Sequence, residues 1–362
     1  MEEMKKYILG DVCSRLSSGK GISSEEVFES GPYPVIGGNG LRGYSLRSNF
    51  SGECGVIGRQ GAYCGNVRFF SGEAYMTEHA VVVVGNEKAD TRYLTYLLST
   101  MHLGNLSAQS AQPGLSVKTL AKQEIVLPSF PEQKRRASIL ASLEDKIDLN
   151  NRINHNLEEQ AKHYFDEWCR GCDDEKSIAE LSFNILDYSQ NQRDKVILLN
   201  SSDVTEGIFE ALPYVENKDL KGQFKKRFRK GDILYSEIRP RNHHYAICYF
   251  EAEDYIASTR LMIIRRNPEL LSSDALLYQY LLMPRVEEEF TSKTESRSGT
   301  FPQGNYEDLS ASVVPYSREN QVISDTLDSL YSIIWLNMEE NKRLASFRDA
   351  LLPMLMSGDL TC

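Results

Sequence analysis

The sequence has no apolar run long enough to cross a membrane and no cysteine pattern typical of a disulfide-bonded domain. Its longest apolar stretches, such as Ala80–Val84, have the length of a strand, whereas a spanning helix needs about 20 residues. Seven cysteines, an odd number without regular spacing, indicate the reduced thiols of a cytoplasmic protein. The first dozen residues mix acidic, basic and apolar side chains and are not expected to form a signal peptide.

Motifs for catalysis and for binding metals or cofactors are also scarce. The stretch Ser17–Gly21 (SSGKG) lacks the spacing of a phosphate-binding loop, and neither GxGxxG after a strand nor HExxH occurs. Cys169 and Cys172 form a single CxxC without a second pair of ligands, so neither a zinc site nor a redox site is expected. Asn267–Pro268 lacks the aromatic neighbour of an adenine-methylating site. The sequence therefore predicts no catalytic site, no metal and no cofactor in this chain.

The net charge of −10 argues against nucleic-acid binding, but the charges are unevenly distributed. Residues 1–130 carry twelve basic and twelve acidic side chains. The segment Ser30–Gly72 contains four arginines and a single acidic residue. The segment Lys221–Arg241 contains eight basic and two acidic residues. The overall charge thus conceals two basic regions.

Two segments 187 residues apart share a helical pattern. Leu143–Gln160 and Leu330–Phe347 are identical at six of eighteen positions, and both place asparagines within an apolar heptad repeat. Proline precedes each helix, as is common at a helix start. The expected seam, which continues in the first copy through Tyr164, comprises Leu140, Leu143, Ile147, Asn150, Asn154 and Leu157 in the first helix, and Leu327, Leu330, Ile334, Asn337, Asn341, Leu344 and Leu351 in the second.

These helices could pack on separate cores or on each other. Antiparallel pairing that sets Asn150 against Asn341 also sets Asn154 against Asn337. A polar side chain in a seam costs stability unless it is paired, and paired asparagines fix the alignment. We therefore favour direct antiparallel pairing. About 37 residues at roughly 1.5 Å each would make a rod of about 55 Å, longer than the roughly 34–36 Å of one DNA turn.

The segments outside the long helices also resemble each other in order. Each has apolar strand-like runs, a polar loop with arginine, another strand, a short helix and a Ser/Gly/Gln-rich segment. We predict an α+β fold with a pseudo-twofold internal repeat. Its domains are 1–130 (β-rich), 131–170 (central long helix), 171–315 (β-rich) and 316–362 (C-terminal long helix, paired with the central one).

Three polar stretches are candidate binding surfaces. Lys221–Asp232 interleaves two phenylalanines with six cations, which favours phosphate contact, although a solvated edge strand would give the same pattern. Arg59–Asn66 and Arg239–His244 offer side chains that can hydrogen-bond to base edges, although polar turns are common. Their matching positions in the two halves support the binding interpretation.

The whole chain resembles the specificity (S) subunits of type I restriction–modification systems. The resemblance rests on the duplicated order, the helix opening at Leu127–Gln133 (LPSFPEQ), its body Leu143–Gln160, the strand–loop–strand Gly55–Val67 and the ending Leu351–Leu360. The second helix departs from the family pattern, with Asn320 where glutamine is usual, which puts partner contacts at that helix in doubt.

This resemblance implies two target recognition domains that read the halves of a bipartite, asymmetric DNA sequence, separated and joined by the two antiparallel coiled-coil helices. It implies a non-catalytic, cytoplasmic subunit that docks two methyltransferase (modification) subunits and restriction subunits. S-adenosylmethionine, ATP and Mg²⁺ are then expected in those partners, which together form an adenine-N6 methyltransferase and an ATP-dependent translocase and nuclease. The alternatives are a coiled-coil scaffold bridging two protein-binding domains and a stand-alone enzyme.

The candidate DNA-binding residues are polar or cationic. In the first half they are Arg42, Arg59, Gln60, Tyr63, Asn66 and Arg68. In the second half, Lys225, Lys226, Arg227 and Arg229 are expected on phosphates, and Arg239, Arg241, Asn242, His243 and His244 on bases, with Arg297 and Thr300 bordering a nearby loop.

Overall fold

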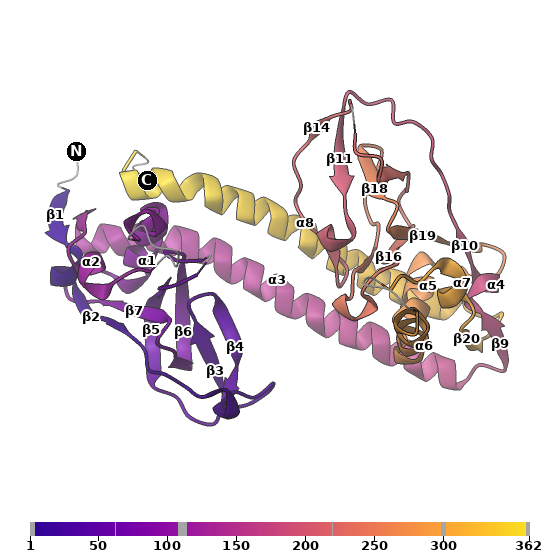
Figure 1. Cartoon of the computed structure of the whole chain (residues 1–362), viewed down its shortest axis with the longest axis horizontal. Coiled ribbons are helices and arrows are strands. Elements are labelled where there is room, and N and C mark those ends of the chain that lie inside the picture. Colours follow the sequence, from indigo (N-terminus) through magenta and orange to yellow (C-terminus); the bar gives the residue numbers. More distant parts are fainter. Residues whose placement is uncertain (1–3, 62, 108–113, 219, 298–301, 360–362) are drawn as a thin grey trace. The chain divides into compact units, whose positions relative to one another are not determined.

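The computed structural model describes residues 4–61, 63–107, 114–218, 220–297 and 302–359 (Figure 1). The chain forms two compact units, Met1–Leu149 with Glu340–Cys362 and Asn150–Glu339. Helices α3 (Phe130–Arg170) and α8 (Gln321–Ser357) each contribute one part to each unit and begin close to the expected starts. Within the described ranges, no helix is both long and apolar enough to cross a bilayer.

The first unit contains a six-stranded sheet with the order β2-β7-β5-β6-β3-β4. A separate antiparallel pair, β1 and β8, precedes α3. The elements are β1 (Lys5–Ile8), β2 (Cys13–Ser18), β3 (Tyr33–Gly37), β4 (Gly40–Ser45), β5 (Phe50–Gly58), β6 (Val67–Met76), β7 (Ala80–Gly85), α1 (Thr91–Thr100), α2 (Val117–Ala121) and β8 (Glu124–Leu127). The buried run Ala80–Val83 of β7 lies inside this sheet, which explains its uniformly apolar sequence.

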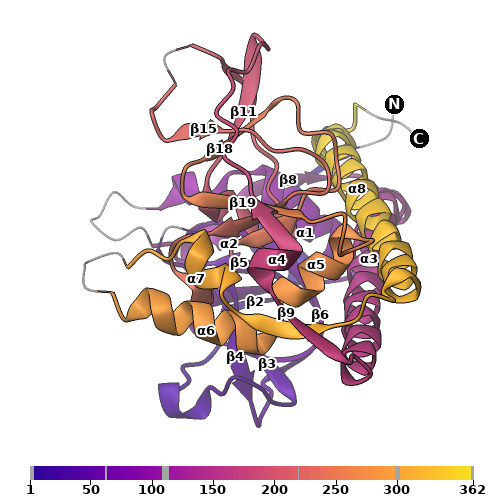
Figure 2. The same ribbon diagram turned by 90° about the vertical axis from the view of Figure 1, so that its right-hand side faces the viewer.

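The second unit contains two four-stranded sheets, β10-β19-β16-β17 and β14-β11-β18-β15. Figure 2 faces this unit and shows α5 and α6 beside its first sheet. The elements are β9 (Asp174–Ser177), α4 (Ile178–Leu181), β10 (Ser182–Asn184), β11 (Lys195–Leu199), β12 (Val204–Thr205), β13 (Ile208–Phe209), β14 (Val215–Glu216), β15 (Phe224–Lys226), β16 (Ile233–Ser236), β17 (Tyr245–Ile247), β18 (Tyr255–Ser258), β19 (Leu261–Arg266), α5 (Asp274–Leu281), α6 (Pro284–Glu295), α7 (Tyr306–Ser310) and β20 (Val313–Tyr316).

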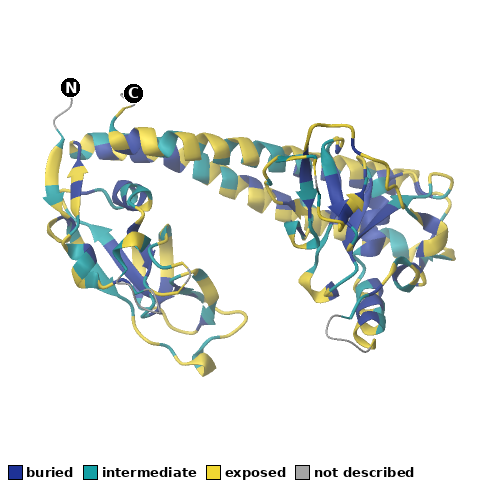
Figure 3. Ribbon diagram, turned by 45° about the horizontal axis from the view of Figure 1, so that its top comes forward, coloured by how far each residue is buried: buried dark blue, intermediate teal, exposed yellow. Residues whose placement is uncertain are grey.

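The two units repeat one topology. The antiparallel order β2-β7-β5-β6 of the first unit corresponds to β10-β19-β16-β17 of the second. The pair β1–β8 that precedes α3 corresponds to the pair β9–β20 that precedes α8. In both units the core gathers the sheet, the short helix and part of both long helices, and Figure 3 shows buried residues on these facing surfaces. The predicted internal repeat is therefore present.

In the first unit the last turns of α8 pack against the first turns of α3. Leu140 and Leu355 are fully buried in the same core, and the seam residues Leu143, Ile147, Asn341, Leu344 and Leu351 are half-buried. Arg136 is 1% exposed and donates from Nη1 to the carbonyl oxygen of Leu355, 2.8 Å away. An early residue of α3 thus meets a late residue of α8, as antiparallel pairing requires.

In the second unit the pairing continues with the same alignment. Asn337 donates from Nδ2 to Oδ1 of Asn154 at 2.8 Å, the facing expected from the sequence. Leu327 and Ile334 are buried in the core together with Ala161, while Leu157 and Leu330 are half-buried beside it. Asn150 and Asn154 are both buried.

Toward the end of α3 the apolar face departs from the expected seam. Tyr164 is 47% exposed, whereas its neighbour Phe165 is buried and packs edge-on against Tyr280 at 5.1 Å between ring centroids. A straight helix has 3.6 residues per turn, whereas the heptad repeat assumes 3.5. The mismatch accumulates along α3, so that near its end the buried face is formed by the residue after the one that the heptad predicts. Phe165 therefore replaces Tyr164 in the seam.

Two side-chain amides, 187 positions apart, fasten the long helices to their units. Gln133 accepts from the backbone N–H of Asp90 at 2.9 Å and donates to the carbonyl of Lys88. Asn320 accepts from the N–H of Ser272 at 3.1 Å and donates to the carbonyl of Leu270. Both amides are buried, so the asparagine that replaces the usual glutamine performs the same structural task.

Candidate nucleic-acid interface

The polar loop of the first unit connects β5 to β6, and backbone hydrogen bonds hold its base. Gly58 donates to the carbonyl of Asn66, and Gly65 donates back to the carbonyl of Gly58, both at 2.8 Å. Gly65 has φ +85°, and a Cβ there would lie 2.1 Å from the backbone nitrogen of Gly104, so this position requires glycine. The predicted residues Gln60, Tyr63 and Asn66 are exposed on this loop, and Arg59 is half-buried at its base.

A shallow cavity of about 330 Å³ brings two predicted residues together. Arg42 from β4 and Gln60 from the β5–β6 loop line it with Asn39 and His79. Asn39 and His79 were not predicted from the sequence. Asn39 lies between glycines in the turn of the β3–β4 hairpin, and nothing in that short polar turn indicates that it meets the β5–β6 loop. Four hydrogen-bonding side chains thus surround one depression.

Arg68 has a different position from the one expected of a base-contacting residue. It lies on β6, and its Nη1 donates to the carbonyl oxygen of Asn39 at 2.7 Å. Arg68 is exposed, so its guanidinium can still meet a phosphate, but this hydrogen bond also holds the β3–β4 turn in place.

In the second unit, two adjacent lysines of strand β15, both predicted to contact phosphates, differ in exposure. Lys225 is exposed, whereas Lys226 is 4% exposed and donates to the carbonyl oxygen of Leu261 at 2.7 Å. Burial lowers the pKa of Lys226, and Glu237 lies 3.5 Å from its Nζ. Because successive side chains of a strand point to opposite faces, Lys226 faces inward with Phe224. The prediction that Lys226 contacts a phosphate is therefore wrong.

The two arginines after β15 also differ. Arg227 is half-buried, and its Nη2 donates to the carbonyl oxygen of Glu253 at 3.0 Å, so it ties neighbouring loops together. Arg229 is exposed in the turn before β16. Lys225 and Arg229 are therefore the two cations of this group that the structure leaves on the surface.

The loop between β16 and β17 contains a short 3₁₀ turn, Pro240–Asn242, flanked by two residues with positive φ. Arg239 (φ +50°) and Asn242 are exposed. Arg241 is also exposed, and Glu295 accepts hydrogen bonds from its Nε at 2.8 Å and its Nη2 at 3.1 Å. Arg239, Arg241 and Asn242 line a cavity of about 340 Å³, so these predicted residues are brought together.

The two histidines of this loop are turned toward carboxylates and backbone of their own unit. His243 places Nδ1 3.0 Å from Glu206 and Nε2 2.8 Å from Glu287. The hydrogen bond to Glu206 raises the pKa of His243, which favours the imidazolium. His244 Nδ1 lies 2.9 Å from the carbonyl oxygen of Val204. Both ring nitrogens of His243 thus face carboxylates of the same unit. These partners lie more than 35 residues away in the sequence, so the polar loop alone could not indicate them.

Arg297, the remaining candidate that the structure describes, lies near α7. Arg297 is exposed, but its Nη2 lies 2.8 Å from Asp308, and its Nη1 donates to the carbonyl oxygen of Gln303 at 2.6 Å. Thr300 lies outside the described residues. Arg297 therefore stabilises the segment that leads to α7.

The thiols of the CxxC motif, Cys169 and Cys172, are not activated. Burial raises the pKa of Cys169 to about 12 and that of Cys172 to about 11, so both are protonated at neutral pH. Among the residues with described positions, no three His, Cys, Asp or Glu side chains are grouped to hold a metal ion.

Comparisons with known proteins agree with this architecture. Residues 1–159 match the family described as Type I restriction modification DNA specificity domain. The chain is 40% identical over 156 residues to the type I restriction enzyme EcoprrI specificity subunit of Escherichia coli, covering 42% of this chain and 38% of that protein. It is 35% identical over 180 residues to the HindI specificity subunit of Haemophilus influenzae, covering 49% and 39%. The matches thus span about two fifths of these relatives' lengths.

A solved structure extends the likeness in fold. The type I restriction-modification S subunit from M. genitalium superimposes with a TM-score of 0.64 at 14% identity, covering 98% of this chain and 96% of that one. This likeness concerns the fold alone. The family match is confined to residues 1–159, which resemble the Type I restriction modification DNA specificity domain.

Proposed function

We propose that this chain is the sequence-specific DNA-binding subunit of a type I restriction–modification complex. The observation that carries the proposal is the repeated position of two polar, exposed loops. Each lies between the two strands of an antiparallel pair, β5–β6 in one unit and β16–β17 in the other, within sheets of one topology. One of these units belongs to the segment that matches the DNA specificity family.

Each unit would read one half of a bipartite, asymmetric sequence. In the first, Arg42, Gln60 and Tyr63 have the donors and acceptors that recognise base edges. In the second, Arg239 and Asn242 have the same role. Arginine pairs well with guanine, and asparagine or glutamine with adenine, which makes these side chains suited to direct readout.

Phosphate contacts would position the duplex. Lys225 and Arg229 are the exposed cations among the four residues predicted on phosphates, and clustered cations release counterions from DNA. The net charge of −10 is compatible with DNA binding if the partner subunits help to enclose the duplex.

Catalysis would be supplied by partners. In this proposal the chain is non-catalytic and docks two modification subunits, which methylate adenine with S-adenosylmethionine. Restriction subunits that use ATP and Mg²⁺ would join the same assembly. The chain's own contribution is then recognition and assembly.

The proposal is tested by DNA retention of the purified chain with its modification subunits across a series of salt concentrations. Selective retention of one bipartite sequence that weakens steeply as salt rises is expected, because several Lys/Arg contacts release counterions. The alternative, a protein scaffold bridging two protein-binding domains, predicts no DNA retention at any salt concentration. Absence of sequence selectivity in the assembled complex contradicts the proposal.

A further inference from the structure

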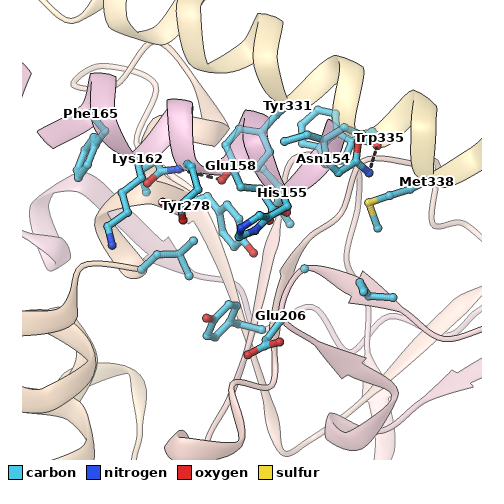
Figure 4. Close-up of a pocket in the computed structure, with 18 of the residues that line it drawn as sticks. Asn154, His155, Glu158, Lys162, Phe165, Glu206, Tyr278, Tyr331, Trp335 and Met338 are labelled. Carbon is cyan, nitrogen blue, oxygen red and sulfur yellow. Dashed lines mark hydrogen bonds between the residues drawn. The ribbon is translucent and has the colours of Figure 1, made fainter. Parts of the chain in front are cut away.

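A cavity of about 580 Å³ in the second unit has a composition unlike that of the loop surfaces. It lies against α3 and α8 and is drawn in Figure 4. Aromatic rings form much of its wall: Phe165, Tyr245, Tyr278, Tyr331 and Trp335. Four carboxylates complete it: Glu158, Glu159, Asp166 and Glu206. Aromatic faces and carboxylates both attract cations.

One polar group of this wall has no partner within the protein. Tyr278 is 4% exposed, and a Cβ added at the lining residue Gly207 would lie 3.2 Å from its hydroxyl oxygen, so the hydroxyl faces the cavity. Within the described residues it makes no hydrogen bond. Burial raises the pKa of Tyr278 far above its ordinary value, so it remains a neutral phenol. A hydroxyl that faces a cavity can be satisfied by water or by a bound group.

The described lining has four carboxylates against one lysine, Lys162, and one histidine, His155, so it is acidic overall and favours a cation. One of the carboxylates, Glu206, is already paired with His243. Neither Glu158 nor Glu159 forms a salt bridge with any residue that the structure describes. Partial burial raises the pKa of Glu158, and the negative charges of Glu159 and Glu206 raise it further against the opposing effect of His155. Figure 4 shows Glu158 and Lys162 on α3 and Glu206 on the opposite wall.

The first unit has a cavity of about 460 Å³ in the corresponding place, and there the chain supplies its own cation. Arg92 places Nη2 3.0 Å from Asp145, and its Nε donates to the hydroxyl of Tyr96 at 3.2 Å. Its guanidinium carbon lies 4.7 Å from the centroid of the Phe69 ring. A guanidinium is thus held by a carboxylate, a phenol and an aromatic face.

A hydrogen bond between the short helix and a long helix lies at a corresponding position in each cavity. Tyr96 on α1 donates a hydrogen bond to Glu144 on α3, and Gln279 on α5 donates one to Tyr331 on α8 at 2.9 Å. Glu144 and Tyr331 are separated by 187 positions, the spacing of the helical repeat. The second cavity has the carboxylates, phenols and rings, but its described lining contains no arginine.

We propose that the cavity of the second unit binds the guanidinium of an arginine side chain presented by a partner protein, a modification subunit. Arginine fits better than lysine because its planar group stacks on rings while its N–H groups reach carboxylates. His155, Glu158 and Lys162 are exposed on the rim, so a side chain from another protein surface can enter. The identity of the partner rests on the proposed function.

Trp335 provides a direct reporter of occupancy. The chain has two tryptophans, and Trp168→Phe leaves Trp335 in the cavity wall as the single emitting tryptophan. Titration of this full-length variant with N-acetyl-L-arginine amide should give a saturable change in emission. N-acetyl-L-citrulline amide, which has a similar shape and no charge, should give none.

Two substitutions test the assigned groups. Glu158→Gln should weaken binding of the arginine probe by about tenfold or more, because it removes a carboxylate from the cavity, and Tyr278→Phe should weaken it several-fold. Glu167→Gln, on the exposed face of α3 outside the cavity, is the matched control and should bind like its parent. If Glu158→Gln fails to fold by circular dichroism, Glu159→Gln takes its place. No saturable change, an equal response to citrulline or normal binding by the carboxylate variants would overturn the proposal.

The source of the arginine is tested by assembly with the modification subunit. Glu158→Gln should weaken assembly by about tenfold, and excess arginine probe should compete with the subunit. Should the probe bind while assembly stays unchanged and uncompeted, the partner assignment is wrong. DNA selectivity is measured separately, at a modification-subunit concentration high enough to saturate assembly. It tests the proposed function, and it does not depend on how tightly the cavity binds arginine.

Discussion

Asn337 donates a hydrogen bond from Nδ2 to Oδ1 of Asn154 across the paired helices of the second unit, at 2.8 Å. The Nδ2 of Asn154 in turn donates to the carbonyl oxygen of Ile334 at 3.3 Å. Both polar ends of the buried Asn154 are therefore used, one by a side chain and one by the backbone of the opposite helix. A shift of the alignment by one residue would break both hydrogen bonds.

Replacing Asn337 with leucine should destabilise the protein. The substitution leaves the buried Oδ1 of Asn154 without its donor, which costs about 1–3 kcal/mol. Urea unfolding, followed by circular dichroism, measures the loss. Asn156→Leu is the control, because Asn156 lies on the exposed face of α3, the helix that carries Asn154, and its replacement should change stability by less than about 0.5 kcal/mol. Equal losses in the two variants would show that the hydrogen bond has no structural role.

The neighbouring lysines of β15 should give opposite phenotypes. Lys225→Ala should weaken binding of the assembled complex to all DNA sequences alike and reduce the salt dependence by about one phosphate contact, with little effect on folding. Lys226→Ala should lower the unfolding free energy by about 1–3 kcal/mol, because it removes the buried donor to the carbonyl oxygen of Leu261 and the ion pair with Glu237. Binding isotherms at several salt concentrations and urea unfolding separate these outcomes. A Lys226→Ala protein that folds normally and loses DNA affinity would contradict the assignment.

Arg239 and Arg42 should each control one half of the recognised sequence. A base contact by arginine is worth about 1–3 kcal/mol of discrimination. Arg239→Ala should therefore relax preference in one half-site, and Arg42→Ala in the other. Selection from a library of random DNA with each variant complex measures the change. If both variants relax the same half-site, the two units do not read separate sequences.

Glu132 makes stability depend on acid pH. Hydrogen bonds from Arg135, with a further contribution from Arg136, lower the pKa of Glu132 from 4.5 to about 2. A carboxyl whose pKa is lower in the folded state stabilises the protein above its unfolded pKa and loses this effect as pH falls through the folded value. Stability should therefore fall between about pH 4.5 and 2. Glu132→Gln should be less stable at neutral pH and lack this part of the pH dependence. If the unfolding free energies of the two proteins change with pH in the same way over that range, the role assigned to Glu132 is wrong.

The sequence predicts the parts of the fold that depend on local periodicity. The alternating steps of three and four residues identify both long helices, and the asparagines within them predict the facing of Asn154 and Asn337. The seam fails at Tyr164 because the face of α3 near its end is selected by contact with Tyr280, which belongs to a distant helix. Periodicity within one helix contains no information about that contact.

The candidate interface is predictable in position but only partly in residue roles. Composition alone groups Lys225 with Lys226, and only the direction of the strand separates an exposed cation from a buried one. Glu206 and Glu287, the partners of His243, lie on other elements and cannot be inferred from a polar loop. The aromatic cavity is assembled from α3, α8, β17 and α5, so no single stretch of sequence indicates it.

Mapping methylated adenines in DNA treated with the assembled complex tests the central claim most directly. If two repeated units read DNA independently, methylation will occur within one sequence composed of two short specified runs separated by a constant number of unspecified bases. Methylation at a single uninterrupted motif, or at adenines without a shared sequence context, would contradict the assignment of one half-site to each unit.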